Sequence, residues 1–397
     1  MVEKLEFSLA KLLRSILTIS VLGFGGGAAV IPLFHKEFVE KYKWLSDDEF
    51  QDILSVSNAL PGPIQTKIAG YIGFRLKGIL GMITSLLCII LPSLFAMLIF
   101  YNTINYYKDE LWVSSAISSV LPVVTVLMLL LSISFLKKSS KKLNTLSNLM
   151  LIALSAIAIV LLKINPAILI IIILLAVFIP AKNDNMRFGL IGFLILLVYL
   201  ISYFLTNSID FNLGLDISNS SNLFKVFYSF FVPGVLGYGG GPGSLSLISY
   251  EVVDHVQLLT SDQFGLVVAI QASLPGVTAT KLAGTIGFQA AGIIGSLVGV
   301  FVYVTPSMIL MVTLLKLLNK YKNSPTVKRL TSFVGPVIFV LLVQLTVNFF
   351  LSSLDALGWI YTLIFISVNI VLLAKLKIHP FFAILISMGA GIIIALI

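Results

Sequence analysis

The same segment occurs twice in this chain. Residues 23–93 and residues 237–307 align without a gap at a shift of 214 positions, and roughly a third of the aligned residues are identical. Glycines, prolines, one lysine and two helix-capping sequences fall in register, which chance similarity between apolar segments would not produce. The sequence therefore predicts two related halves.

The composition places both halves in a lipid bilayer. Hydrophobic residues make up 58% of the 397 positions and charged residues only 11%, against about 25% charged residues in soluble domains. Many apolar runs are close to the roughly 20 residues that span the hydrocarbon layer. These runs cover residues 79–100, 116–135, 143–162, 168–179, 188–205, 293–315, 334–351, 360–374 and 381–397. We predict an all-α polytopic protein of the plasma membrane, and its isoleucine- and lysine-rich usage is consistent with a bacterium.

Basic residues in short loops predict which side of the membrane each loop occupies, and the net charge of +9 therefore indicates topology rather than nucleic-acid binding. Loops with several Lys or Arg are expected in the cytoplasm: residues 137–142, 182–187, 320–329 and 375–377. Loops around Asp210, Asp216 and Asp355 have acidic residues and no basic ones, and are expected outside.

Loops that align at the 214-residue shift carry opposite charge. The four-lysine loop 137–142 aligns with the turn at Asp355, and the basic loop 320–329 aligns with Asp109 and Glu110. We therefore predict inverted halves, residues 1–185 and 223–397, joined by a transmembrane helix and external loop at 186–222. Inverted repeats are characteristic of secondary transporters, whose site lies near the membrane midplane between the halves. A channel, a membrane enzyme or a duplicated scaffold remains the alternative.

The first two elements of each half contain too many helix breakers for plain spanning helices. In the first half they are residues 21–34 and 50–74, with glycines at 23, 25–27, 62, 70 and 73 and prolines at 32, 61 and 63. We predict broken or re-entrant helices, because irregular backbone at membrane depth is tolerated where protein buries it or where it lines a cavity. The number of full crossings stays open, from nine to thirteen.

Two glycine triplets are candidate anion-binding loops: Gly25, Gly26 and Gly27 in the first half, and Gly239, Gly240 and Gly241 in the second. Glycine lets backbone amides approach a ligand, and consecutive exposed amides form an anion nest. Close helix packing through small residues is the alternative interpretation.

Prolines and glycines also precede a helix in each half: Pro61, Gly62 and Pro63 in the first, and Pro275 with Gly276 in the second. Proline is well placed at a helix start, and the free amides and positive dipole end of such a helix attract an anion. We expect an oxyanion in the break.

A lysine and a threonine follow each of these breaks, Thr66 with Lys67 and Thr280 with Lys281. An ionisable group inside an apolar segment predicts a functional site, and a cation in the first turn opposes the helix dipole unless an anion compensates. The alternatives are a lysine that extends to the membrane interface and a threonine that bonds to its own helix.

Glu37 and Glu251 also align, each ten residues after its glycine triplet. Such a carboxylate could carry a coupling proton if burial raised its pKa. The alternative is an ordinary solvated glutamate.

Several other features predict structure or exclude chemistry. Ser46 with Glu49, and Thr260 with Gln263, match the capping box that starts a helix. The three histidines are scattered without metal-ligand spacing, and the single cysteine excludes an intrachain disulfide. No hydrolase or nucleotide-binding motif occurs. We predict a protein that is not an enzyme, needs no cofactor and uses a gradient as its energy source.

The paired motifs carry a family resemblance. FGGG followed by LPGPIQTKIAGYIGF, with a second copy containing LPGVTATKLAGTIGF, resembles the chromate ion transporter family in its long, two-domain form, over nearly the whole chain. The resemblance implies a carrier that expels chromate by using the proton motive force, with sulfate as competitor. It also implies that Gly25–Gly27, Pro61–Pro63, Lys67 and their counterparts are functional. Val277 stands where Pro63 does, so the halves are not equivalent.

Together these features predict a secondary transporter of a divalent tetrahedral oxyanion, held between two opposed helix N-termini near two lysines. Sulfate or another oxyanion as cargo, and a passive anion channel, are the alternatives kept open. The sequence is compatible with a homodimer but does not require one, and it fixes neither the direction of transport nor the coupling ion.

Overall fold

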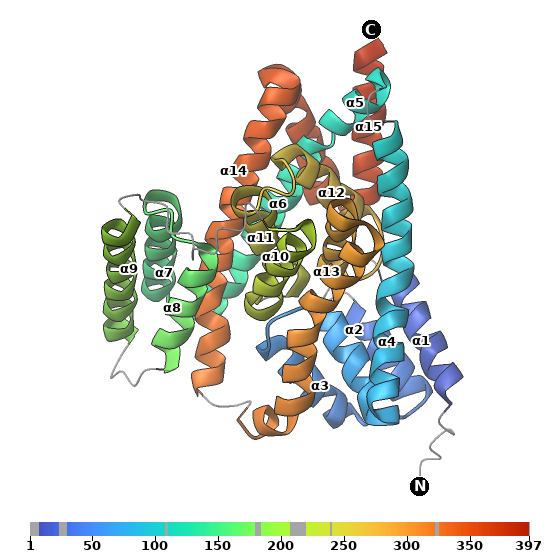
Figure 1. Cartoon of the computed structure of the whole chain (residues 1–397), viewed down its shortest axis with the longest axis vertical. Helices are drawn as coiled ribbons and strands as arrows, with labels where there is room; N and C mark the ends of the chain where they lie inside the picture. Colours follow the sequence, from blue (N-terminus) through green and yellow to red (C-terminus); the bar gives the residue numbers. More distant parts are fainter. Residues whose placement is uncertain are drawn as a thin grey trace.

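A computed structural model of the chain describes residues 8–23, 30–107, 110–178, 184–206, 220–238, 240–321 and 325–396. Every regular element in these ranges is a helix. Four of the described helices are long and apolar enough to cross a membrane, and further apolar helices are shorter. The prediction of an all-α polytopic membrane protein is confirmed. The two ends of the chain lie at opposite ends of the molecule (Figure 1).

In the described residues of the first half, ten elements precede the connecting helix. They are α1 (Leu9–Leu22), α2 (Ile31–His35), the π-helix η2 (Lys36–Lys41), α3 (Asp47–Ala59), α4 (Ile64–Tyr106), α5 (Leu111–Ser118), α6 (Leu121–Lys142), α7 (Thr145–Ala156), the π-helix η3 (Ile157–Leu161) and α8 (Pro166–Phe178). Helix α9 (Asp184–Thr206) follows, and α7, α8 and α9 stand together at one side of the molecule (Figure 1).

The second half repeats this order. Its elements are α10 (Asn222–Leu236), α11 (Gly240–Ser249), the π-helix η4 (Tyr250–His255), α12 (Ser261–Ser273), α13 (Thr278–Tyr321), α14 (Pro325–Ile370), the π-helix η5 (Val371–Lys375) and α15 (Pro380–Leu396). Helix α14 covers the positions of α5, α6 and α7, and its one non-helical residue, Gly358, aligns with Asn144, the N-cap that separates α6 from α7.

Local backbone features recur at the same 214-residue shift. The π-helices η2 and η4 cover equivalent positions, as do η3 and η5. Lys43 and Gln257 both have positive φ, and so do Lys163 and Lys377. The structural repeat therefore extends at least to Lys377, well beyond the segment in which the residues themselves are similar.

Helix α4 is a hairpin of two helices. Lys77 and Gly78 have non-helical dihedral angles, and a Cβ on Gly73 would collide with the carbonyl oxygen of Gly81. Residues eight apart in a continuous helix are about 12 Å apart along the axis, so the chain must reverse at Gly78. Gly78 permits the turn because its φ is +61°. Gly292 does the same in α13, with φ +64°.

Each half begins with two antiparallel helical hairpins. In the first, the Ser15 hydroxyl of α1 donates to the Glu37 carboxylate of η2 at 2.7 Å. In the second, Arg75, at the end of the first part of α4, pairs with Glu49 in the first turn of α3. Both ends of the second hairpin thus lie together, while its Leu60–Pro63 tip lies at the other end. In the first half the helices thus end at Leu22 and Ala59, next to the glycines and prolines that predicted the breaks.

The parts of α4 and α13 that follow the turns at Gly78 and Gly292 are long helices that run along the molecule. In Figure 1, α4 reaches the end where the C-terminus lies, whereas α13 ends toward the N-terminus. One apolar core runs through both sets of hairpins and includes Ile16, Ile68, Val267, Leu282 and Ile338. A second core lies between α7, α8, α9 and the first part of α14.

Candidate functional site

The hairpin tips of the two halves are joined by a pair of backbone hydrogen bonds. The Gly62 amide donates to the Gly237 carbonyl at 2.8 Å, and the Gly276 amide donates to the Gly23 carbonyl at 3.0 Å. The two bonds are equivalent under the 214-residue shift. Each one joins the second hairpin of one half to the first hairpin of the other, so the four breaks meet in one region.

Glycine is required at positions 62 and 276 for two reasons. Their φ angles are +87° and +101°, a conformation that other residues rarely adopt. A Cβ on Gly62 would lie 2.5 Å from the Cβ of Ser307, and one on Gly276 would overlap the Cβ of Ser93. Ser93 and Ser307, which align at the 214-residue shift and each follow a proline, therefore pack against the tips of the opposite half, a role that the sequence analysis did not suggest.

Lys67 and Lys281 each stabilise the tip of their own hairpin through hydrogen bonds to backbone carbonyls. The Lys67 ammonium donates to the carbonyls of Ser57, Leu60 and Pro61 at 2.6, 2.6 and 3.0 Å. Lys281 repeats the arrangement at 2.8, 2.8 and 3.2 Å, on the carbonyls of Gln271, Leu274 and Pro275. Each lysine thus caps the C-terminal end of the preceding helix, where cations are stabilised by the helix dipole.

The hydrogen bonds of these lysines indicate a charged ammonium. Three acceptors need three N–H donors, and only the protonated form of lysine has three. Both side chains are at most 1% exposed. Among the described residues no carboxylate forms an ion pair with either one. Two buried positive charges therefore lie at the tips without a carboxylate partner.

The neighbouring threonines bond to their own tips. The Thr66 hydroxyl donates to the Pro63 carbonyl at 3.0 Å, and the Thr280 hydroxyl donates to the Val277 carbonyl at 2.9 Å. In this conformation the donor protons of Thr66, Lys67, Thr280 and Lys281 are thus all engaged within the hairpins, although the positive charge remains.

Three helix N-termini converge at the tips. A Cβ on Gly240 would lie 3.4 Å from the Ile64 side chain at the start of α4. One on Gly241 would lie 2.9 Å from the Cβ of Thr278 at the start of α13. The first amides of a helix have no partner within that helix, and the N-cap Pro63 offers no side-chain bond. Three positive dipole ends therefore point into the region where the breaks meet.

One side chain at this position has no hydrogen-bond partner. Gln65, in the first turn of α4, is 2% exposed, and neither its amide nitrogen nor its amide oxygen makes a hydrogen bond. An unsatisfied buried amide costs about 1–3 kcal/mol. The aligned residue in the second half is Ala279. Sequence reasoning missed Gln65, although its mismatch with Ala279 was a visible signal.

The aligned glutamates have different partners in the two halves. Both Glu37 oxygens accept from Lys41 at 2.9 Å, and the Lys41 side chain is 52% exposed. Glu251 instead accepts from the His255 ring at 2.8 Å, and the two side chains are 1% and 3% exposed. His255 was not predicted to be functional, but it aligns with Lys41 at the 214-residue shift.

The remaining predicted features are partly described. Both capping boxes form as predicted, at Ser46 with Glu49 and at Thr260 with Gln263. Within the described ranges, no three His, Cys, Asp or Glu side chains cluster to hold a metal ion. Gly25, Gly26, Gly27 and Gly239 lie outside the described residues.

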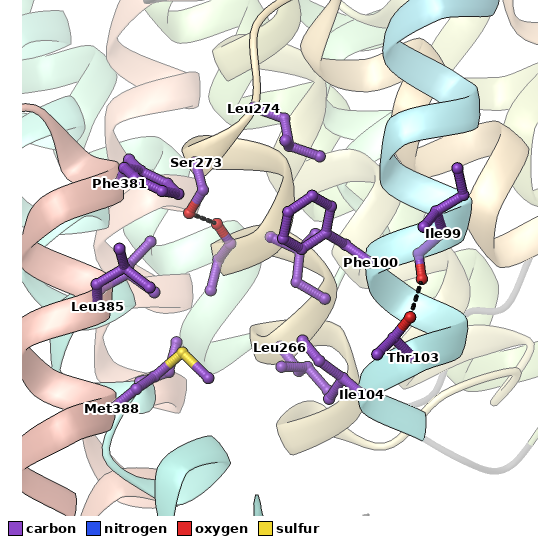
Figure 2. Close-up of a pocket in the computed structure, with 14 residues that line it drawn as sticks. Ile99, Phe100, Thr103, Ile104, Leu266, Ser273, Leu274, Phe381, Leu385 and Met388 are labelled. Carbon is purple, nitrogen blue, oxygen red and sulfur yellow. Dashed lines mark hydrogen bonds between the residues drawn. The ribbon is translucent and has the colours of Figure 1, made fainter. Parts of the chain in front are cut away.

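An apolar cavity of about 370 Å³ lies between α4, α12 and α15 (Figure 2). Its two hydroxyl groups, on Thr103 and Ser273, donate to carbonyls of their own helices at 2.8 and 3.0 Å. The rest of the lining is apolar apart from the backbone, with Phe100, Phe381 and Leu385 among the larger side chains. This cavity offers no donor to an oxyanion, so we place the candidate site at the hairpin tips instead.

Comparison with known proteins identifies the relatives of this chain. A family model described as Chromate transporter matches residues 10–179 and again residues 224–392. The uncharacterized transporter MJ0718 of Methanocaldococcus jannaschii is 28% identical over 400 residues, which cover 98% of this chain and 94% of that protein. A probable chromate transport protein of Synechococcus elongatus is 25% identical over 338 residues, 83% and 81% of the two chains.

A shorter relative, the uncharacterized transporter YwrB of Bacillus subtilis, is 43% identical over 154 residues, which cover 39% of this chain and 78% of that protein. No solved structure matches the chain.

Proposed function

This chain belongs to the chromate transporter family, and we propose that it is a secondary transporter that expels chromate, a divalent tetrahedral oxyanion, by using the proton motive force. The supporting observation is the pair of buried lysines, each donating to three carbonyls and without a carboxylate partner in the described structure, at the meeting point of three helix N-termini. Bringing a dianion to two such cations leaves the site close to neutral, which limits the cost of removing the charges from water.

In the proposed site the anion accepts hydrogen bonds from the backbone and not from the lysines. The first amides of α4, α11 and α13 are the available donors, and the Gln65 amide nitrogen is a fourth. We include the glycine triplets Gly25–Gly27 and Gly239–Gly241 in the proposed site, because glycine leaves backbone amides accessible to a ligand. Lys67 and Lys281 supply the charge, while Thr66, Thr280 and residues 61–63, 275 and 276 shape the tips.

We further propose that the halves have inverted topology and rock against each other. The opposite ends reached by α4 and α13 in Figure 1 support this proposal. The two bonds between Gly62 and Gly237 and between Gly276 and Gly23 are the backbone contacts that such a motion would break and re-form. A carboxylate among the aligned pair, Glu37 or Glu251, would carry the coupling proton.

Uptake of labelled chromate by inverted vesicles tests the function. We expect accumulation in energised vesicles that sulfate reduces, and none after the proton gradient is collapsed. Accumulation that sulfate does not reduce would show that sulfate does not compete with chromate for the site. A flux that follows the chromate gradient alone, with or without energy, would support the passive channel and contradict the coupled exporter.

Replacing Gln65 tests the binding site separately from the fold. Gln65→Leu removes a donor to the anion, and one hydrogen bond to a charged group contributes about 1.5–3 kcal/mol, so we expect KM for chromate to rise by roughly tenfold or more. Because the amide is buried and unpaired, the same change should preserve or raise the melting temperature in detergent. Unchanged KM would show that Gln65 does not bind the anion, and a loss of stability would show that Gln65 has a structural role. Ala279→Leu is the control at the aligned position.

A further inference from the structure

We propose that Glu251 and His255 together form the proton-binding site of the transport cycle, and that the equivalent pair in the first half, Glu37 and Lys41, has only a structural role. The inference rests on the proposed function and deepens it. It starts from a difference between the aligned halves. Both have a glutamate at this position, Glu37 or Glu251, but its partner four residues later is Lys41 in the first half and His255 in the second.

The two partners have different chemistry. Lysine stays protonated at neutral pH, so Glu37 and Lys41 form a fixed ion pair, and the Ser15 hydroxyl gives Glu37 a further hydrogen bond. Histidine gains and loses its proton in the physiological range. In the second half the serine equivalent to Ser15 is Ser229, whose buried hydroxyl has no hydrogen-bond partner. The Glu251 carboxylate therefore has an imidazole partner in place of a permanently charged ammonium.

Because the pair is buried, the number of protons that it binds determines whether a net charge is left away from water. With one proton between them, Glu251 and His255 are neutral overall, either as an ion pair or as two neutral groups. Adding or removing a proton leaves a net charge on side chains that are only 1% and 3% exposed, which is costly away from water. The pair should therefore exchange protons only when the first hairpin of the second half opens to water, and this requirement links protonation to movement.

The surroundings contain few competing charges. From α10, the Tyr228 ring packs edge-on against the His255 ring at 5.4 Å, and the other ionisable residue of that helix, Lys225, lies one turn earlier. Helix α11 carries no ionisable residue. On η4 itself, Tyr250 stacks at an angle against His255, and Asp254 is exposed. Among these elements, no other cation is close enough to Glu251 to form an ion pair in the described structure.

Exchanging the partners tests the proposal. His255→Lys recreates the fixed pair of the first half. We expect this variant, like Glu251→Gln, to retain downhill chromate flux and to lose energised accumulation. A gradient of one pH unit supports about tenfold accumulation per coupled proton, so the expected loss is at least of that size. Asp254→Asn, an exposed carboxylate on the same element, is the control and should accumulate chromate normally. Normal accumulation by His255→Lys would overturn the proposal.

A second measurement does not depend on the cargo. Infrared difference spectra of the purified, reconstituted full chain, recorded across the titration range of histidine, should contain a glutamic acid carboxyl band that disappears in Glu251→Gln and His255→Lys. If that band is present but the wild type moves no oxyanion, the proposed function fails and the proton site stands. If the wild type accumulates chromate but the band persists in both variants, the proton site is wrong and the function stands.

Discussion

Replacing Lys67 or Lys281 by methionine is expected to abolish transport and to destabilise the protein strongly. Methionine has a similar length but no donor, so each change leaves three carbonyls without their ammonium partner. An unsatisfied buried polar group costs about 1–3 kcal/mol, so the three together correspond to several kcal/mol. The melting temperature in detergent and chromate uptake measure the two effects.

The matched control is Lys11→Met, which removes an exposed lysine of α1. It should change neither stability nor uptake, because an exposed charge without a fixed geometry contributes little. Lys67→Arg provides a second comparison. Arginine keeps the charge but not the compact shape of an ammonium, so we expect it to be tolerated poorly in so tight a cap. Normal transport by Lys67→Met would contradict the role of the lysine charge in the anion site, and an unchanged melting temperature would contradict the structural cap.

Much of the fold followed from the sequence because repetition and helix breakers are local signals. The aligned capping boxes predicted where α3 and α12 begin, and the Pro-Gly breaks predicted where α4 and α13 begin. The turns at Gly78 and Gly292 fall between predicted elements, since one element was expected to end at residue 74 and the next apolar run to begin at 79, but the reversal of the chain there was not predicted. A glycine between two helical segments does not distinguish a kink from a full reversal, because the distinction depends on which helices pack on either side.

The site was harder to predict because its contacts are between hairpins. The sequence placed Lys67 at a helix start and suggested an anion as its partner, whereas the structure shows carbonyls of the preceding helix accepting all three of its protons. The role of His255 was missed because one sequence gives no sign that residue 255 faces Glu251 and not water. Only the folded η4 brings the two side chains together, four residues apart on one face.

Gly62→Ala and Gly276→Ala are expected to have the second large effect, through the contact between the halves. Each adds a Cβ where the backbone has positive φ and where the serine of the other half already lies. A close contact in a packed core forces the backbone or its neighbours to shift, and here the amide of the substituted residue itself bonds across the halves. We expect transport to be lost in both variants, measured as chromate uptake normalised to the amount of folded protein.

Backbone strain and the lost approach between the halves can be separated. Gly78→Ala introduces the same kind of strain, since φ there is +61°, but its Cβ would meet no atom within 4 Å. Strain of this kind costs on the order of 1–3 kcal/mol, so Gly78→Ala should lower the melting temperature yet retain transport. The double variant of Gly62→Ala with Ser307→Gly removes the collision but keeps the strained backbone. Loss of transport in that double variant would show that the tip conformation itself is required. Recovery in that double variant would show instead that the close approach of Ser307 to the tip is the essential feature.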